Sequence, residues 1–388
     1  MHIKKNIFGL FIAFAILTGI SVNIFADGEV IPAGKEFKPD SRASILMEAS
    51  TGTVLYENNS SEPLPIGTLN KIMTVLLVSE AIDGGKLSHD TTVTASKYAN
   101  SMKQAVIWLN VGEKMSVSDL LKGVIIGNAN DASIALAEAV AGTEEAFVGM
   151  MNSRAKELGM MNTNFKNCTG LDVEGQGSCA YDVALMSREL IKHKDLYGYM
   201  TCWMDSLRNG ATEIVSTNVL VKSYKGIIGI KAGYTAAAAN CLSVAATRDG
   251  VTYIAVVLGC ADKDSRFTEG KNLLNTGFSN YQVVKPDVPE ELSQPLKVKG
   301  GVEKEIVPEI QDYRNIVIPN GQFKNVKCEY QINEKIEAPV EDKQIIGEIS
   351  FFLDDKLIYK SNLISSCEIE KMSITKALSI LTKSLFTF

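Results

Sequence analysis

Residues 67–82 read GTLNKIMTVLLVSEAI, and the fold assignment starts from this segment. From Ile72 onward it has almost no polar face, which predicts a helix that is buried nearly all round. Lys71 nevertheless stands at its beginning, and a buried ammonium is costly unless it is paired or hydrogen-bonded. Either Lys71 reaches solvent from the first turn, or it faces a cleft together with Thr68, three residues earlier on the same helical face.

The composition bounds the class of protein. The chain has 388 residues, of which 46% are hydrophobic, and a net charge of −6, so it is long enough for two domains and is not a general nucleic-acid binder. It has only three histidines, so lysine or a carboxylate would have to supply any acid–base chemistry. The seven cysteines show no C-x-x-C spacing. We expect them to be mostly free and buried, and we expect neither a metal site nor a cofactor.

The N-terminal segment has the pattern of a secretory signal peptide. A basic start, MHIKK, precedes the apolar run NIFGLFIAFAILTGI, and a small residue, Ala26, ends the segment. We therefore expect residues 1–26 to be cleaved and the mature chain to lie outside the cytoplasmic membrane, with an uncleaved anchor helix as the alternative.

The C-terminal segment, residues 369–388, has a different pattern. On a helical wheel its apolar residues share one face, away from the lysines: Ile374, Ala377, Leu378, Leu381, Leu385 and Phe388. Such a cationic amphipathic helix is typical of a peripheral anchor at a membrane surface. The alternative is a helix docked on its own protein.

Between these ends the hydrophobic period changes twice. Residues 41–57 predict two strands around a turn, and residues 68–158 predict helices with a polar interruption at 128–131. Two later runs, GIIGIKAGY and CLSVAATRDGVTYIAVVLGC, predict strands, the second folded into a hairpin at 248–250. Helices flanked by strands from both ends predict an α+β domain with one antiparallel sheet. A proline-containing linker, 284–295, then precedes a small all-β domain at 296–368.

Three polar groups stand in otherwise apolar surroundings: Thr68–Lys71, Asn128–Asn130 and Lys231–Gly233. Their order, and flanking runs such as NDASIALAEAVAG and GIKAGYT, resemble the serine D-alanyl-D-alanine carboxypeptidases, the low-molecular-mass penicillin-binding proteins. That family carries S-x-x-K, S-x-N and K-T-G at these places. The resemblance implies a penicillin-binding-protein/β-lactamase-like α+β domain over residues 27–283, with the β domain and amphipathic helix after it.

The resemblance also implies a ligand and a role for each site residue. The ligand would be a peptidoglycan stem peptide ending in D-Ala-D-Ala, and β-lactams would react at the nucleophile position. The implied catalytic positions are Thr68, Lys71 and Asn128, and the implied substrate-binding positions are Asn130, Lys231, Ala232 and Gly233.

All three motifs depart from the family pattern, since they read TLNK, NAN and KAG. The methyl group of Thr68 stiffens its χ1. The amide of Asn128 cannot relay a proton, and the loss of a proton-transfer group typically lowers the catalytic rate by roughly 10²–10⁴. Ala232 lacks a hydroxyl that could donate to the ligand carboxylate, and a hydrogen bond to a charged group contributes roughly 1.5–3 kcal/mol. Lys103 and Gln104 replace a stretch that is usually rich in Gly-Gly-Ser.

Two interpretations therefore remain. The departures favour a relative with weak or no hydrolytic activity that binds cell-wall peptide or a protein partner, and β-lactams weakly if at all. The alternative is an active D,D-carboxypeptidase that uses Thr68 as its nucleophile. A β-lactamase is a distant third possibility, because no loop glutamate for deacylation can be identified.

Overall fold

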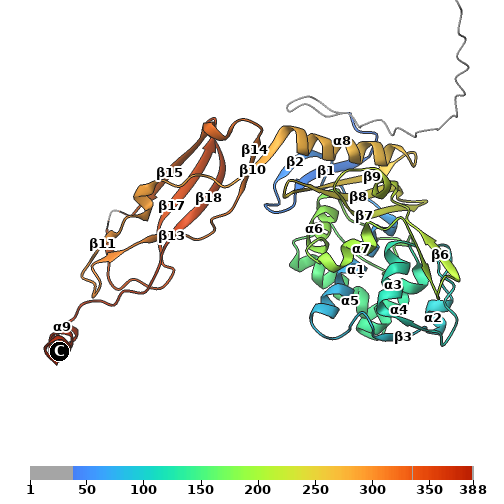
Figure 1. The fold of residues 1–388 in the computed structure, drawn as a ribbon, viewed down its shortest axis with the longest axis horizontal. Helices are drawn as coiled ribbons and strands as arrows, with labels where there is room; N and C mark the ends of the chain where they lie inside the picture. Colours follow the sequence, from blue (N-terminus) through green and yellow to red (C-terminus); the bar gives the residue numbers. More distant parts are fainter. Residues whose placement is uncertain (1–37, 334, 387–388) are drawn as a thin grey trace, which may run out of the picture.

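The computed structural model describes residues 38–333 and 335–386, so the expected signal peptide lies outside the described residues. The first part of the chain forms an antiparallel five-stranded sheet in the order β2-β1-β9-β8-β7 (Figure 1). The strands are β1 (Ala43–Glu48), β2 (Val54–Asn58), β7 (Ile227–Thr235), β8 (Ala239–Arg248) and β9 (Val251–Cys260). Strands from both ends of the domain thus share one antiparallel sheet, as the sequence predicts, and they meet at the β1–β9 pair.

Side-chain alternation gives this sheet two buried faces. In β1, Ile45 and Met47 pack on the helical side, while Leu46 packs on the opposite side. The β8–β9 hairpin turns at Asp249 and Gly250, both in the left-handed region with φ of 50° and 81°. An Asp-Gly pair suits this turn because both positions need positive φ.

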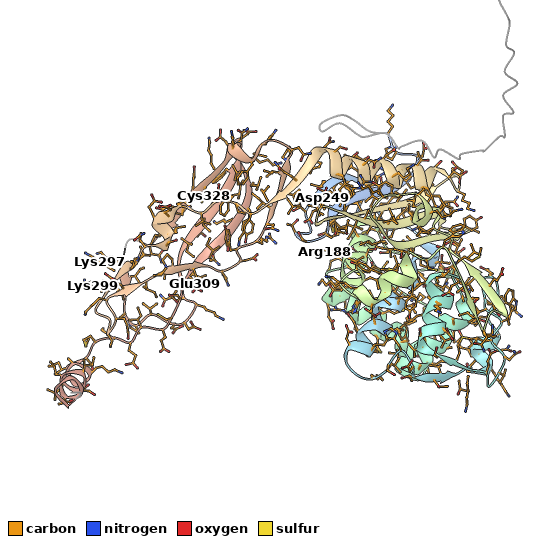
Figure 2. The ribbon with its side chains drawn as sticks, viewed as in Figure 1. Arg188, Asp249, Lys297, Lys299, Glu309 and Cys328 are labelled. Atoms are coloured by element: carbon orange, nitrogen blue, oxygen red, sulfur yellow. The ribbon has the colours of Figure 1, made fainter. Side chains whose placement is uncertain are left out.

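Helices cover both faces of the sheet, which confirms the α+β class (Figure 1). The helix α8 (Ser265–Asn280) packs on β8 and β9 from one side. The cluster on the other side comprises α1 (Lys71–Asp83), α2 (Lys97–Asn100), α3 (Val117–Ile125), α4 (Asn130–Ala141), α5 (Glu144–Glu157), α6 (Ala180–Leu190) and α7 (Tyr197–Met200). From α6, Arg188 reaches the β1–β2 turn, where it donates to the carbonyls of Ala49 (2.5 Å) and Ser50 (2.8 Å) (Figure 2).

Short elements connect these helices. There are two small two-stranded sheets: β3 (Thr92–Thr94) pairs with β4 (Lys114–Ser116), and β5 (Met204–Leu207) forms a hairpin with β6 (Thr212–Val215). Short 3-10 helices also occur in this part of the chain: η1 (Gly67–Asn70), η2 (Lys194–Leu196) and η3 (Val219–Lys222). Two more, η4 (Glu290–Ser293) and η5 (Phe323–Asn325), come after α8. The segment predicted to be a linker, 284–295, is packed rather than free, since Leu292 of η4 is buried in the core of the β domain.

The β domain has its own core and extends away from the first domain (Figure 1). Its strands are β10 (Tyr281–Val284), β11 (Leu296–Lys299), β12 (Glu305–Ile306), β13 (Pro308–Ile310), β14 (Ile316–Pro319), β15 (Val326–Ile332), β16 (Ile336–Glu337), β17 (Ile345–Leu353) and β18 (Lys356–Ser365). The helix α9 (Ile374–Phe386) follows at the far end. Residues 369–372 belong with the β domain, because Ile369 pairs with Val340 and Lys371 pairs with Gly301.

The cysteines agree with the expectation that they are mostly free and buried. All seven cysteines are free, and four of them are buried: Cys168, Cys179, Cys241 and Cys260. Within residues 38–333 and 335–386, no helix has the length and apolar character needed to cross a bilayer.

Candidate active site

The first motif lies where η1 passes into α1. Lys71 is the first residue of α1 and is 0% exposed, so the interpretation in which it reaches solvent is wrong. Its ammonium is instead satisfied by two acceptors: it donates to Oδ1 of Asn130 (2.7 Å) and to the carbonyl of Thr169 (2.6 Å). The second motif therefore holds the lysine of the first through Asn130, a contact that the sequence did not predict.

Burial changes the acid–base character of Lys71. Loss of hydration lowers its pKa well below the usual lysine range, and the nearby charge of Lys231 lowers it further. A buried lysine with a lowered pKa can act as a neutral general base. A neutral amine has two N–H groups, which suffice for the two acceptors just described. The proton acceptor that this chemistry needs is therefore present.

The hydroxyl beside this base is less well placed. Thr68, in η1, is only 5% exposed, and its Oγ1 accepts a long hydrogen bond of 3.5 Å from Nδ2 of Asn128. In the described part of the chain no hydrogen bond joins Thr68 to Lys71. The other end of the Asn128 amide, Oδ1, is buried and has no partner among the described residues. Thr68 thus has a neighbour that holds its hydroxyl but cannot carry a proton away.

The backbone explains why asparagine is tolerated at position 128. Asn128 has a φ of 59°, in the left-handed region that asparagine visits more readily than most side chains. It lies in the short connection between α3 and α4, directly across from Thr68. The amide therefore fits the backbone here, while the hydroxyl of the family's serine is lost.

Two glycines allow the chain to close around Thr68. A Cβ on Gly233 of β7 would lie 2.9 Å from Oγ1 of Thr68, so the strand can approach the hydroxyl only without a side chain there. A Cβ on Gly170 would lie 2.2 Å from the carbonyl oxygen of Gly67, and Gly170 also has a positive φ of 77°. The third motif and the 170 region thus meet the first motif through glycines.

The remaining residues of the third motif lie on opposite faces of β7. Lys231 pairs with Ser243, whose hydroxyl bonds Ser187 of α6, so Lys231 points to the helical side. Its ammonium donates to the carbonyl of Val124 (3.1 Å), and burial lowers its pKa to about 7. Ala232 instead packs with Leu242 on the α8 side and is buried. The structure therefore brings Lys231 and Gly233 to Thr68 and Lys71, but not the side chain of Ala232.

The loop that contains Lys103 and Gln104 supports the second motif. Asn130 donates from Nδ2 to the carbonyl of Lys103 (2.8 Å) and from its backbone N–H to the carbonyl of Ala105 (2.7 Å). These bonds orient the amide so that its oxygen faces Lys71. Gln104 has a φ of 67°, a conformation that glycine adopts without strain. Gln104 therefore adopts a backbone conformation typical of glycine while the loop holds Asn130.

A second supporting segment supplies the carbonyl of Thr169. Asn167 accepts from the N–H of Gly170 (2.7 Å) and donates to the carbonyl of Leu171 (2.9 Å). Gln176 also donates to the carbonyl of Leu171 (2.9 Å), which closes the segment into a compact turn. No sequence pattern singled out Thr169, because the group that matters is a backbone carbonyl.

Comparison with known proteins places this arrangement in a family. The profile described as D-alanyl-D-alanine carboxypeptidase matches residues 32–262. The profile described as penicillin-binding protein 5, C-terminal domain, matches residues 280–371. The chain is 37% identical over 340 residues to D-alanyl-D-alanine carboxypeptidase DacF of Bacillus subtilis, covering 87% of each sequence. It is 36% identical over 339 residues to DacC of Escherichia coli, covering 86% of this chain and 85% of DacC.

A solved structure agrees with these matches. Penicillin-binding protein 5 of Haemophilus influenzae superimposes with a TM-score of 0.80 at 27% identity, covering 87% of this chain and 99% of that one. The fold and the three assembled motifs define a penicillin-binding protein of low molecular mass. The chain belongs to the D-alanyl-D-alanine carboxypeptidase family, a serine-type family, although threonine occupies its nucleophile position.

Proposed function

We propose that this protein binds peptidoglycan stem peptides ending in D-Ala-D-Ala and hydrolyses them weakly or not at all. One observation carries the proposal: Lys71, Asn130 and Lys231 keep an assembled, buried polar site, while the Thr68 hydroxyl bonds Asn128 instead of Lys71. Binding groups are thus retained and the acylation step is impaired. Family membership supports the peptidoglycan-related role.

Lys231 is the residue to which we assign the terminal carboxylate. Burial lowers its pKa to about 7, so the free protein carries this charge below pH 7 and loses it above. A carboxylate binds the charged form, so binding draws a proton onto Lys231 when the pH is high. Affinity should therefore fall as the pH rises through the lowered pKa.

Isothermal titration with a peptide ending in D-Ala-D-Ala tests this proposal. We expect measurable affinity at pH 6, a loss of about tenfold at pH 8, and a loss of at least about tenfold for Lys231→Met, since a hydrogen bond to a charged group contributes roughly 1.5–3 kcal/mol. Lys225→Met is the matched control, because it removes an exposed lysine just before β7. A peptide with a C-terminal amide should bind the wild type as weakly as the acid peptide binds Lys231→Met. Equal affinity for acid and amide would refute the proposal.

We also propose that the mature protein lies on the outer face of the cytoplasmic membrane, held there by α9. Ile374 and Leu378 are 90% and 64% exposed, so the apolar face of α9 is not docked on the β domain at these residues. An exposed apolar face on a cationic helix suits a membrane interface. Lys297 and Lys299 lie at the end of the β domain nearest to α9 (Figure 2) and would favour an anionic surface.

Deletion of residues 373–388 tests the anchor. This cut leaves Ile369 and its pairing with Val340 intact, so the β domain keeps its core. The truncated protein should move from the membrane fraction to the soluble fraction with an unchanged Tm. A truncated protein that still sediments with membranes would rule out α9 as the anchor.

The alternative function, hydrolysis by Thr68, draws on a different observation. The lowered pKa of Lys71 leaves a base within the site that could accept a proton if the threonine hydroxyl turned toward it. The covalent labelling experiment in the Discussion separates the two functions.

A further inference from the structure

Trp108 is exposed in a way that packing does not explain. Its side chain is 71% exposed, and its φ of 55° places a bulky residue in the left-handed region. The other tryptophan, Trp203, is engaged, since the ammonium of Lys222 lies 4.6 Å from its ring centre. Among the described residues, no aromatic or cationic side chain stacks on Trp108. Strained residues that packing does not require concentrate at functional sites.

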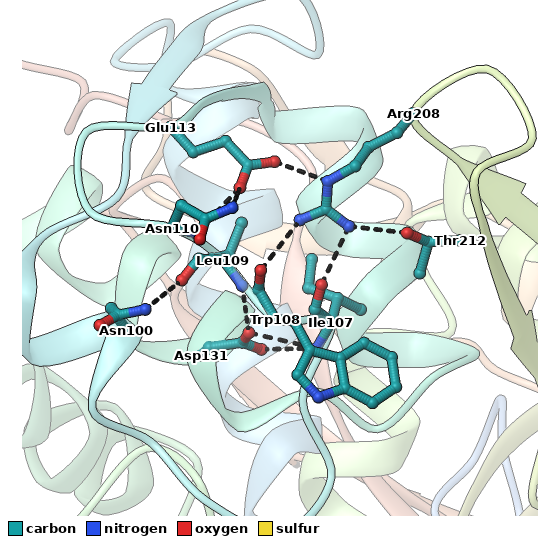
Figure 3. A network of polar contacts seen from close by, with 9 residues as sticks. All are labelled: Asn100, Ile107, Trp108, Leu109, Asn110, Glu113, Asp131, Arg208 and Thr212. Atoms are coloured by element: carbon teal, nitrogen blue, oxygen red, sulfur yellow. Dashed lines mark hydrogen bonds and ion pairs between the residues drawn. The ribbon is translucent and has the colours of Figure 1, made fainter.

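A buried carboxylate fixes the backbone N–H groups of the two residues that flank Trp108. Asp131 accepts the N–H of Ile107 (3.0 and 3.1 Å) and the N–H of Leu109 (3.0 Å), the neighbours of Trp108 on either side (Figure 3). Ile107 and Leu109 are themselves buried. The backbone on both sides of Trp108 is therefore fixed, while the indole is directed outward.

A guanidinium fixes the backbone carbonyl groups of Ile107 and Trp108. Arg208, at the tip of the β5–β6 hairpin, donates to the carbonyl of Ile107 (2.9 Å) and to that of Trp108 (3.5 Å) (Figure 3). Its Nε donates to Glu113 (2.6 Å), so the positive charge is already neutralised. Hydrogen bonds on both sides thus stabilise a strained conformation that presents an aromatic ring.

The same loop reaches the candidate active site. Lys103 and Ala105 accept the two hydrogen bonds of Asn130, which in turn holds Lys71. Trp108 follows Ala105 by three residues, so their Cα atoms are at most about 10 Å apart. The loop that carries Trp108 is therefore hydrogen-bonded to the same residue, Asn130, that holds Lys71. The terminal carboxylate of the ligand is assigned to Lys231 of β7. The loop that carries Trp108 is therefore available to contact the preceding residues of the ligand.

We propose that Trp108 is a specificity-determining residue that packs on the uncharged body of the stem peptide, the residues that precede the terminal D-Ala-D-Ala. This inference rests on the proposed function. An indole offers a large apolar face and one N–H donor at a low cost in conformational entropy. Arg208 is paired with Glu113, and the Asp131 carboxylate is buried, so the residues that hold Trp108 present no unpaired charge to a ligand. The exposed ring itself therefore suits apolar and amide groups rather than ions.

Two probes separate the roles of Trp108 and Lys231: acetyl-D-Ala-D-Ala, and an acetylated pentapeptide with neutral side chains and the same terminus. We expect the pentapeptide to bind about tenfold more tightly to the wild type by calorimetry. In Trp108→Ala the ratio of the two affinities should fall to about one. In a Trp203→Phe protein, Trp108 is the only tryptophan, and the pentapeptide should shift its fluorescence emission.

Two further variants distinguish ligand contact from a structural role. Trp108→Gly should also lose the preference for the pentapeptide, yet its Tm should be unchanged or about 1–2 °C higher, because glycine adopts a φ of 55° without strain. Arg208→Met should lower the preference by releasing the positioned backbone. If the wild type and Trp108→Ala show the same affinity ratio, the inference about Trp108 is overturned and the proposed function stands. If neither probe binds the wild type, both are overturned.

Discussion

The double variant Thr68→Ser/Asn128→Ser is expected to react with a fluorescent penicillin at least about 100-fold faster than the wild type. Serine removes the methyl group that stiffens χ1, so the hydroxyl can turn toward the amine of Lys71. A hydroxyl at position 128 restores a group that can pass a proton, and such a group contributes roughly 10²–10⁴ in rate. The surrounding support, namely Asn130, Thr169 and Gly233, is already in place.

The single variants should recover much less than the double variant. Residues that share one proton path act as a unit, so their effects do not add. Ala232→Thr, as a third change, should raise labelling by less than about tenfold, because the side chain at position 232 lies on the α8 side of β7, away from Thr68. Asn128→Ser should lower stability by about 1 kcal/mol, since serine tolerates a φ of 59° less well than asparagine.

Lys71→Met in the double variant is the control for this gain. It removes the proton acceptor and should abolish the labelling. Labelling of Thr68→Ser alone at the rate of the double variant would show that Asn128 is no obstacle. A folded double variant that stays inert would contradict the account, because the base, the nucleophile and the relay would all be present.

Asp131→Ala should lower the free energy of unfolding by about 3–5 kcal/mol. The Asp131 carboxylate is buried and accepts the N–H groups of Ile107, Leu109 and Ala132. Its removal leaves three buried donors without a partner, at about 1–3 kcal/mol each before the loop relaxes. Denaturant unfolding followed by circular dichroism measures the change.

Asp119→Ala is the matched control for this loss. It removes the same group from the first turn of α3, where the side chain is 39% exposed and its carboxylate lies 3.8 Å from the ammonium of Lys122. An exposed ion pair contributes about 0–1 kcal/mol. If Asp131→Ala and Asp119→Ala lower the free energy of unfolding equally, the hydrogen bonds of Asp131 beneath Trp108 do not stabilise the fold as described.

Much of the fold could be predicted because the deciding signals are local. The Asp249–Gly250 turn of the β8–β9 hairpin and the apolar run of α1 depend on residues that are adjacent in sequence. A single antiparallel sheet followed from the position of strands at both ends of a helical segment, but the pairing of β1 with β9 within it was not predicted. The proximity of the three motifs came from the family resemblance and not from the residues alone.

What could not be predicted depends on tertiary contacts. Gln104 and Trp108 adopt positive φ because distant groups hold the loop, and no pattern within the loop indicates this. Thr169 contributes a backbone carbonyl, a group that every residue has, so its role cannot be predicted from the residue type. The start of α9 was placed too early, because pairing of residues 369–371 with the β domain replaces helical bonds there.

We expect this site to bind its ligand without acylation of Thr68. Intact-mass spectrometry of the wild-type protein after prolonged incubation with excess penicillin tests it most directly, with the double variant Thr68→Ser/Asn128→Ser as the positive control. The wild type should keep its unmodified mass, while the double variant should gain the mass of one penicillin. A stoichiometric adduct on the wild type, mapped to Thr68 by peptide sequencing, would contradict the account and identify a threonine enzyme.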